Sequence, residues 1–309
     1  MKRTWIHHAI IVNEGRRFAG SVVIEGEKIQ EVIEGDGAPA AVCDEQIDAQ
    51  GCFLLPGVID DHVHFRDPGL THKADMATET AAAAAGGVTS FMDMPNCNPQ
   101  TTTLEALENK FKDAATKCIV NYSFYFGATN NNADQLKALD KTHVCGVKLF
   151  MGASTGNMLV NRMEALKKIF SEAGMLIATH CEDQQIIREN TERFKQQYGE
   201  DLDISFHPLI RSEEACYHSS ALAVQLAKET GARLHILHIS TARELGLLED
   251  RPLHEKKITA EACVSHLMFC DEDYAQFGAR IKCNPSIKTK ADRDALRKAL
   301  TTNLIDVIA

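Results

Sequence analysis

The sequence has few basic side chains for its length and no long apolar run. Its 309 residues carry 33 Lys and Arg against 43 Asp and Glu, and the formal net charge of -10 argues against a nucleic-acid-binding surface. No apolar run approaches the ~20 residues of a membrane span, so we expect no membrane partner. The N-terminus lacks a long apolar stretch, and we therefore expect no signal peptide.

The ten cysteines form no CxxC pair. A disulfide scaffold is unexpected in a chain of this length, so the cytoplasm is the natural setting. Cys97, Cys145, Cys181 and Cys263 lie near the ends of predicted strands. We interpret each as a small buried apolar side chain, with a metal-binding thiolate as the alternative.

The residues that are present indicate an ordinary globular protein, with 44% hydrophobic and 25% charged side chains. Residues 1–55 hold short β-branched stretches separated by turn sequences at 13–15 and 25–27, which predicts a small antiparallel β unit. Such a unit is too small to be stable alone and should pack on something else. We therefore predict a small β annex at residues 1–55 and a larger domain at residues 56–309.

From residue 56 onward, short apolar stretches alternate with helical patterns. Helices are predicted over residues 72–85, from Ser212 to Gly231, and over residues 293–300. Strands are predicted near residues 58–64, 88–94, 119–126, 144–150, 175–180, 233–239, 258–264 and 304–309. Eight strands with helices between them predict an α/β fold of the (β/α)8 TIM-barrel type. The alternative is an open doubly wound sheet, but the sequence contains neither a GxGxxG fingerprint nor a P-loop.

The first predicted barrel strand ends in two histidines, His62 and His64. Alternate residues of a strand point to the same face, so both imidazoles can grip one metal ion. Two ordinary core or surface histidines are the alternative. Because further ligand types recur at the ends of later strands, we favour a metal-dependent hydrolase.

Those later strands carry Lys148, His180 and His238, at the strand ends where barrel active sites are built. His235 and His238 are three residues apart and so face opposite sides of a strand. We choose His238 because it lies nearer the C-terminal end, and we expect His235 to be a core or helix-facing residue. His266, at the end of the next strand, is either a structural histidine or a substrate contact.

Lys148 interrupts an apolar strand. An ordinary lysine is only a donor and cannot bind a metal, but burial lowers its pKa. The neutral amine can react with carbon dioxide to give a carbamate, whose two oxygens could bridge two metals. The alternative, which the spacing alone favours, is a lysine that snorkels to solvent or pairs with an acid.

Longer motifs surround these residues. Asp-His-Val-His-Phe-Arg-Asp-Pro-Gly stands at residues 61–69, Gly-Gly-Val-Thr at 86–89 and Asp-Met-Pro-Asn at 93–96. They are followed by Val-Lys-Leu-Phe-Met at 147–151, Thr-His-Cys-Glu at 179–182, Leu-His-Ile-Ser-Thr at 237–241 and Asn-Pro-Ser-Ile-Lys at 284–288. The pattern resembles the dihydroorotases of the amidohydrolase superfamily, over nearly the whole chain from about residue 51.

The resemblance implies a (β/α)8 barrel with a small N-terminal β-sandwich annex and two zinc ions in the barrel. In the family, the residues that match His62 and His64 bind one zinc, and those that match His180 and His238 bind the second. The lysine that matches Lys148 is carboxylated and bridges the two ions.

The resemblance also implies a reaction, the reversible interconversion of L-dihydroorotate and N-carbamoyl-L-aspartate in pyrimidine biosynthesis. Residues that match Arg66 and Asn96 hold the substrate carboxylate, and the match to Asn284 is a further substrate contact. A rim ion pair with Asp67 or Asp61 is the alternative for Arg66. Another cyclic amidase, of the allantoinase or dihydropyrimidinase type, would share the metal ligands, and a non-catalytic scaffold is an alternative of another class. We expect a small-molecule substrate, and a homodimer is possible.

The chain departs from the family pattern at residues 304–309. There the family continues into Thr-Asp-His, whose aspartate binds a metal and shuttles a proton, whereas this sequence ends at Ala309. We therefore expect no catalytic aspartate within the chain, and the last part of the barrel and of the annex to be missing. Asp306 lies too early in the strand to replace it. Loss of such a group typically lowers the rate by about 10²–10⁴.

Overall fold

The structure is a computed structural model and describes residues 1–152 and 158–309. The chain divides into two units, Met1–Val58 and Ile59–Ala309. No helix within the described ranges is long and apolar enough to cross a bilayer.

The N-terminal unit is a five-stranded sheet in the order β3-β2-β1-β4, with β5 also paired to β1. The first three strands form the predicted antiparallel meander, and Gly15 and Gly26 take positive φ angles in the turns between them. β4 and β5 instead run parallel to β1. The strands are β1 (Arg3–Asn13), β2 (Arg16–Glu25), β3 (Lys28–Glu34), β4 (Glu45–Asp48) and β5 (Phe53–Leu54).

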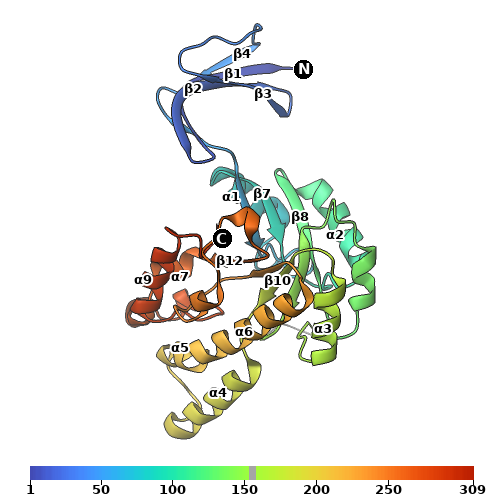
Figure 1. The fold of residues 1–309 in the computed structure, drawn as a ribbon, viewed down its shortest axis with the longest axis vertical. Helices are drawn as coiled ribbons and strands as arrows, with labels where there is room; N and C mark the ends of the chain where they lie inside the picture. Colours follow the sequence, from blue (N-terminus) through green and yellow to red (C-terminus); the bar gives the residue numbers. More distant parts are fainter. Residues whose placement is uncertain (153–157) are drawn as a thin grey trace. The chain divides into compact units, whose positions relative to one another are not determined.

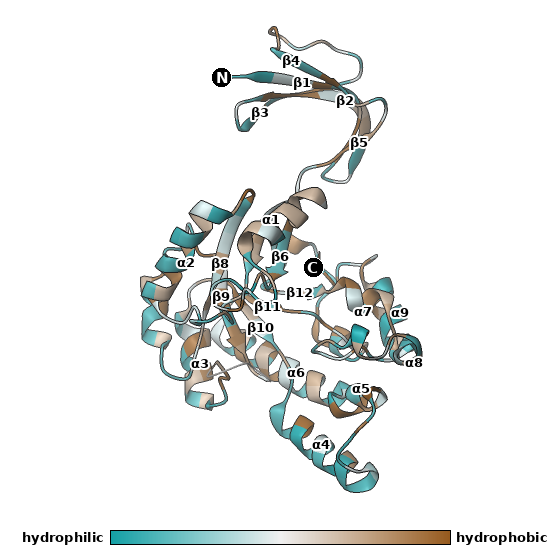
Figure 2. Cartoon of the chain, turned by 180° about the vertical axis from the view of Figure 1, so that it is seen from behind, coloured by the Kyte–Doolittle hydropathy of each residue, from teal (hydrophilic) through white to brown (hydrophobic). Residues whose placement is uncertain are grey.

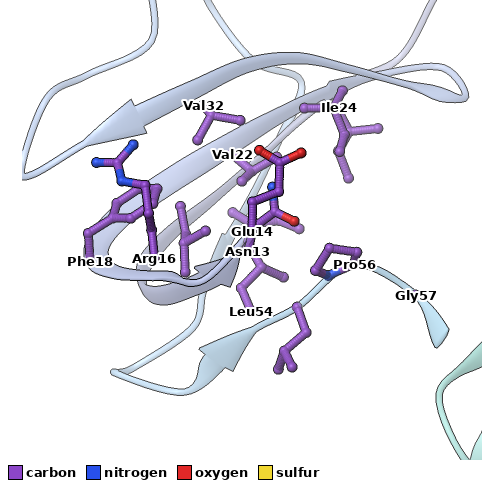
Figure 3. Close-up of a pocket in the computed structure, with 14 residues that line it drawn as sticks. Asn13, Glu14, Arg16, Phe18, Val22, Ile24, Val32, Leu54, Pro56 and Gly57 are labelled. Carbon is purple, nitrogen blue, oxygen red and sulfur yellow. The ribbon is translucent and has the colours of Figure 1, made fainter. Parts of the chain in front are cut away.

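This small sheet buries a modest apolar cluster that includes Ala9, Ile11 and Val22. Beside the cluster lies a hollow of about 420 Å³, and Figure 3 shows Val22, Ile24 and Leu54 among the side chains that line it.

The C-terminal unit is built on a curled sheet of eight parallel strands in sequence order. Each strand corresponds to one of the predicted strands, so the barrel-type α/β fold is confirmed. The strands are β6 (Val58–Val63), β7 (Val88–Asp93), β8 (Asn121–Gly127), β9 (Gly146–Phe150), β10 (Ile177–His180), β11 (Leu234–Ile236), β12 (Ile258–Ala262) and β13 (Val307–Ile308).

Helices connect most of these strands, and α1, α2 and α6 contact β7, β8 and β11 respectively (Figure 1). α4 is hydrophilic over most of its length (Figure 2). The helices are α1 (Met76–Ala85), α2 (Leu104–Lys117), α3 (Met163–Glu172), α4 (Gln184–Tyr198), α5 (His207–Ile210), α6 (Glu213–Thr230), α7 (Val264–Met268), α8 (Tyr274–Phe277) and α9 (Lys290–Ala299).

Local signals set the helix ends. Ser212 caps α6 by accepting a hydrogen bond from the Ala215 N–H, and Gly231 ends this helix in the left-handed conformation, as predicted. α1 begins at Met76 and not at residue 72, because the Asp75 side chain caps it.

A buried ion pair lies beneath the first strand ends. Lys110 Nζ on α2 lies 2.6 Å from Asp93 Oδ2 at the end of β7, and both side chains are 1% exposed. Asp93 also accepts a hydrogen bond of 2.8 Å from the Phe65 N–H. This network ties the segment that carries His64 to the end of β7.

Candidate metal centre

The side chains predicted for the site line one pocket of about 670 Å³ in the C-terminal unit. They come from the middle of β9, from the ends of β6, β7, β10 and β11, and from the segment after α8. The lining residues are His62, His64, Arg66, Lys73, Asn96, Lys148, Phe150, His180, Arg211, His238, Cys263, Ser265, His266, Cys283 and Asn284. The fold thus brings all eight predicted site residues together.

His62 is held by a carboxylate from a strand far along the chain. Its Nδ1 lies 2.5 Å from Oε1 of Glu261 on β12, and the other Glu261 oxygen lies 3.2 Å from Nε2 of His235. Although burial opposes it, the His62 and His235 rings hold the pKa of Glu261 well below its ordinary value. The ionised carboxylate accepts the Nδ1 proton of His62 and leaves the Nε2 lone pair for a metal.

His64 is oriented by Asn96, which follows β7. Nδ1 of His64 lies 2.8 Å from Oδ1 of Asn96. Burial lowers the pKa of His64 well below its ordinary value, so the ring is neutral at neutral pH. The Asn96 oxygen therefore accepts the Nδ1 proton, and the Asn96 amide NH2 remains a donor.

His180 and His238 meet at the ends of β10 and β11. Nδ1 of His180 lies 2.9 Å from Nε2 of His238, and Nε2 of His180 lies 2.9 Å from a Glu182 oxygen. Glu182 thereby fixes the His180 proton on Nε2 and leaves Nδ1 for a metal. His238 has a φ of 41°, and its backbone N–H donates to Glu261 at 2.9 Å. Burial lowers the pKa of both rings, which keeps them neutral.

Lys148 lies in β9 and is 1% exposed. Its Nζ lies 4.6 Å from the centroid of the Phe150 ring, and among the described residues no acid forms an ion pair with it. Burial lowers the pKa of Lys148 to about 7. Neither a snorkelling lysine nor a lysine paired with an acid describes this side chain. Near pH 7 a large fraction of the amine is neutral and can act as a nucleophile.

Arg66 lines the pocket with a free guanidinium. Its neighbour Asp67 pairs with Lys117 at 2.8 Å, and Asp61 lies 3.6 Å from Nε2 of His235. No ion pair among the described residues involves Arg66, so the rim pair considered as an alternative does not form there. The planar fork is therefore available to an anion in the pocket.

Sequence reasoning missed three charged residues of this site. Glu261 holds His62, Glu182 holds His180, and Arg211 forms an ion pair with Glu182. Glu261 could have been recognised from the sequence, because it is a charged residue inside an apolar strand. Lys148 was recognised in the same way. Arg211 has no comparable signal because it lies just before the cap of a helix.

Of the remaining candidates, His266 and Cys263 line the pocket and Asp306 does not. His266 is 5% exposed, its Nε2 lies 3.0 Å from the Pro285 carbonyl oxygen, and burial lowers its pKa to about 4. Burial raises the pKa of Cys263, so its thiol is protonated while no metal is bound. Asp306 does not line the pocket and pairs with Lys256 at 2.8 Å.

The donor set fits zinc. Neutral imidazoles with one nitrogen tied to an acceptor and the other turned to the pocket are usual zinc ligands. Ligand atoms at tetrahedral angles around an ion at ~2.0–2.1 Å lie about 3.3 Å apart. His180 Nδ1 and His238 Nε2, which lie 2.9 Å apart, are slightly closer than this spacing. The buried Nδ1 of His238 has no hydrogen-bond partner among the described residues.

The chain is similar to several known proteins. Residues 51–244 match the family model described as dihydro-orotase-like. An allantoinase of Deinococcus radiodurans is 32% identical over 97% of this chain and 66% of its own length. A dihydroorotase of Methanosarcina mazei is 32% identical over 93% of this chain and 64% of its own length. The L-hydantoinase (dihydropyrimidinase) structure from Arthrobacter aurescens, 24% identical, has a TM-score of 0.93 over 100% of this chain and 69% of that chain.

The chain spans 59% to 66% of the length of the first curated relatives that it matches. The names of the relatives divide between allantoinase and dihydroorotase, and the hydantoinase likeness supports the fold alone. The segment that matches the family model contains the predicted metal ligands, which are His62, His64, Lys148, His180 and His238. The chain belongs to the dihydro-orotase-like family.

Proposed function

We propose that the protein is a metal-dependent cyclic amidohydrolase, which opens a ring by hydrolysing an amide bond. One observation carries the proposal: four histidines and a buried lysine line a single pocket at the strand ends. His62 and His64 would hold one zinc ion, His180 and His238 a second, and carboxylated Lys148 would bridge them. When bound, two zinc ions polarise a carbonyl group and lower the pKa of water near it.

Residues around the site fix the protonation and orientation of the metal-binding histidines. Glu261, Glu182 and Asn96 each accept a proton from a histidine ring, which fixes the tautomer and aims the second nitrogen at the pocket. Burial keeps His64 neutral before any ion arrives. The site is thus organised in advance, and little reorganisation accompanies binding.

The chemistry around Arg66 favours a substrate with a carboxylate. Its guanidinium offers two parallel N–H donors to a carboxylate, and Asn96 offers its amide NH2. Asn284 also lines the pocket and would be a further substrate contact. L-dihydroorotate carries a carboxylate on the same ring as the amide that is hydrolysed. We therefore propose its interconversion with N-carbamoyl-L-aspartate, a step of pyrimidine biosynthesis, as the reaction.

Allantoin is the second candidate, because several relatives are named allantoinase. Its ring has no carboxylate, so Arg66 would have no anion to bind. The metal ligands would serve both substrates and do not discriminate between them.

The substitution Arg66→Ala tests the choice. We expect a strong rise in KM for dihydroorotate while the metal content of the purified protein stays near that of the wild type. Arg66→Lys keeps the positive charge but loses the two parallel N–H donors, so the KM for dihydroorotate should rise less in this variant. Unchanged dihydroorotate kinetics in both variants, or measurable hydrolysis of allantoin alone, would favour the second candidate.

A non-catalytic scaffold is the remaining alternative, and metal analysis separates it from an enzyme. About two zinc ions per chain support the enzyme, and none supports the scaffold.

A further inference from the structure

β1 carries two adjacent histidines at a bulge. His7 and His8 lie opposite a single residue of β2, Ser21. His8 has a φ of 52°, in the left-handed region that residues other than glycine seldom adopt. Consecutive strand residues normally point to opposite faces, but this bulge brings the two rings together. Their Nδ1 atoms lie 3.1 Å apart.

β4 supplies a third donor atom. Asp48 is the register partner of His7, and its Oδ1 lies 3.0 Å from His8 Nδ1. The backbone N–H groups of Ala49 and Gly51 donate to the carbonyl oxygens of His7 and His8, both at 2.8 Å. The backbone that carries both rings is therefore fixed from β4 and the turn after it.

His8 Nδ1 contacts both His7 Nδ1 and Asp48 Oδ1, yet it carries at most one hydrogen. Asp48 Oδ1 also accepts a hydrogen bond of 2.9 Å from the Gln50 N–H. A divalent cation in place of the His8 hydrogen would accept a lone pair from each of the two Nδ1 atoms and from Asp48 Oδ1. Ligands at right angles around an ion at ~2.0–2.1 Å, as in the tetragonal sites of Cu²⁺ and Ni²⁺, lie about 3 Å apart. The observed separations of 3.1 and 3.0 Å agree with that spacing.

The cluster opens onto a hollow. The His8 and Asp48 side chains are 65% and 46% exposed, and His7 and His8 line a hollow of about 340 Å³. Ser21 lines the same hollow, is 2% exposed, and its hydroxyl has no hydrogen-bond partner among the described residues. The hollow leaves room for water or another ligand on the ion.

We propose that His7, His8 and Asp48 form a binding site for a divalent transition-metal ion. Two imidazole nitrogens and a carboxylate favour Cu²⁺ over Ni²⁺ and Zn²⁺. The site lies within Met1–Val58, joins the neighbouring strands β1 and β4 (Figure 1), and is distinct from the candidate metal centre. It does not depend on the proposed enzymatic function.

Trp5 reports on this site. It is the only tryptophan of the sequence, and its ring centroid lies 4.4 Å from that of His7. We expect Cu²⁺, added to zinc-loaded protein in a buffer that does not chelate metals, to quench tryptophan fluorescence in a saturable way. Zn²⁺ added first should shift the midpoint to higher Cu²⁺. Trp5→Phe should abolish the signal. Absence of saturable quenching in the wild type would overturn the proposal.

Substitutions locate the bound ion. His7→Gln, His8→Gly and Asp48→Asn should each raise the midpoint by about tenfold or more. His8→Gly also relieves the left-handed backbone, so a loss of binding in this variant is separable from a loss of folding. His254→Gln removes an exposed histidine beside Glu255 and serves as the matched control. Midpoints that stay within threefold of the wild type in all three variants would contradict the assignment.

Electron paramagnetic resonance gives a second readout. The spectrum of the added Cu²⁺ should show coupling to two imidazole nitrogens in the wild type and to one nitrogen in His7→Gln. A wild-type spectrum with one coupled nitrogen, or a spectrum unchanged by His7→Gln, would contradict a chelate formed by both histidines.

Discussion

The two units of the chain contain hollows of opposite character. In the N-terminal unit, the hollow of about 420 Å³ is lined mainly by apolar side chains such as Val22, Ile24 and Leu54 (Figure 3). In the C-terminal unit, the hollow of about 670 Å³ is lined by imidazole, ammonium, guanidinium and amide groups. An apolar hollow of this kind offers packing area, whereas converging polar groups can bind an ion and orient a substrate. The comparison assigns the proposed chemistry to the C-terminal unit.

The histidines of the two units differ in their burial and in their hydrogen-bond partners. The His62 and His180 side chains are each 6% exposed, and a carboxylate oxygen lies beside each ring, from Glu261 and Glu182 respectively. His8 is exposed and His7 half-buried, and Asp48 contacts His8, whose Nδ1 in turn contacts His7. A buried carboxylate acceptor fixes the tautomer before a metal binds, while the His8 Nδ1 between His7 and Asp48 can exchange its proton for a metal. Substitutions in the two units should therefore have effects of different size.

The largest effect is expected at the buried ion pair of the C-terminal unit. Asp93→Asn leaves the Lys110 ammonium buried without its partner, which should lower the free energy of unfolding by about 3–5 kcal/mol. Denaturant unfolding measures the change. A decrease in the free energy of unfolding of less than about 1 kcal/mol would show that water reaches Lys110, contrary to the fold described here.

The next effect is expected at Glu261, which holds His62 in β6. Glu261→Gln should weaken zinc binding about 10- to 100-fold, because the amide is a poorer acceptor for the Nδ1 proton. Competition with a coloured chelator measures the affinity, and the exposed Glu255→Gln is the control. Equal affinities in the two variants would remove Glu261 from the site.

His266 should make the free energy of unfolding depend on pH. Its folded-state pKa of about 4 lies below the ordinary value of 6.5, so the unfolded chain binds more protons between these values. Stability from neutral His266 is fully present above pH ~6.5 and is lost as the pH falls toward ~4, by up to about 1.4 kcal/mol for each pH unit. His266→Gln should flatten this dependence in thermal unfolding, and His254→Gln should not. An unchanged slope in His266→Gln would place this residue in contact with water.

The smallest effect is expected at an exposed ion pair of the N-terminal unit. Arg16 and Glu34 pair at 2.9 Å, with side chains 63% and 60% exposed. Glu34→Gln makes the same change, carboxylate to amide, as Asp93→Asn. It should lower the free energy of unfolding by about 0–1 kcal/mol, and added salt should shrink the difference. A loss as large as that of Asp93→Asn would erase the contrast between the units.

Sequence patterns predicted the fold well because its signals are local. Apolar stretches marked the barrel strands, and Ser212 and Gly231 bounded α6 as predicted. The parallel pairing of β4 and β5 with β1 was not predicted, since it depends on contacts between residues far apart in the chain. The start of α1 was misplaced because Asp75 competes successfully as its cap.

The sequence predicted site residues that can be recognised by their own type and position in a strand. It did not predict residues whose role depends on a contact with a distant partner. The choice of His238 over His235 rested partly on strand alternation, but β11 ends at Ile236 and His238 has a left-handed backbone. Position near the strand end was the sound part of that argument. Glu261 lies 199 residues from His62, so no spacing rule could pair them. His235, expected in the core, also contacts Glu261.

Anomalous diffraction from crystals of the purified protein, recorded at the zinc edge, tests the central claim most directly. We predict two peaks in the pocket, one within bonding distance of His62 and His64 and the other of His180 and His238, with density beyond Lys148 Nζ that joins them. Crystals grown with zinc that show no peak beside these four histidines would contradict the account.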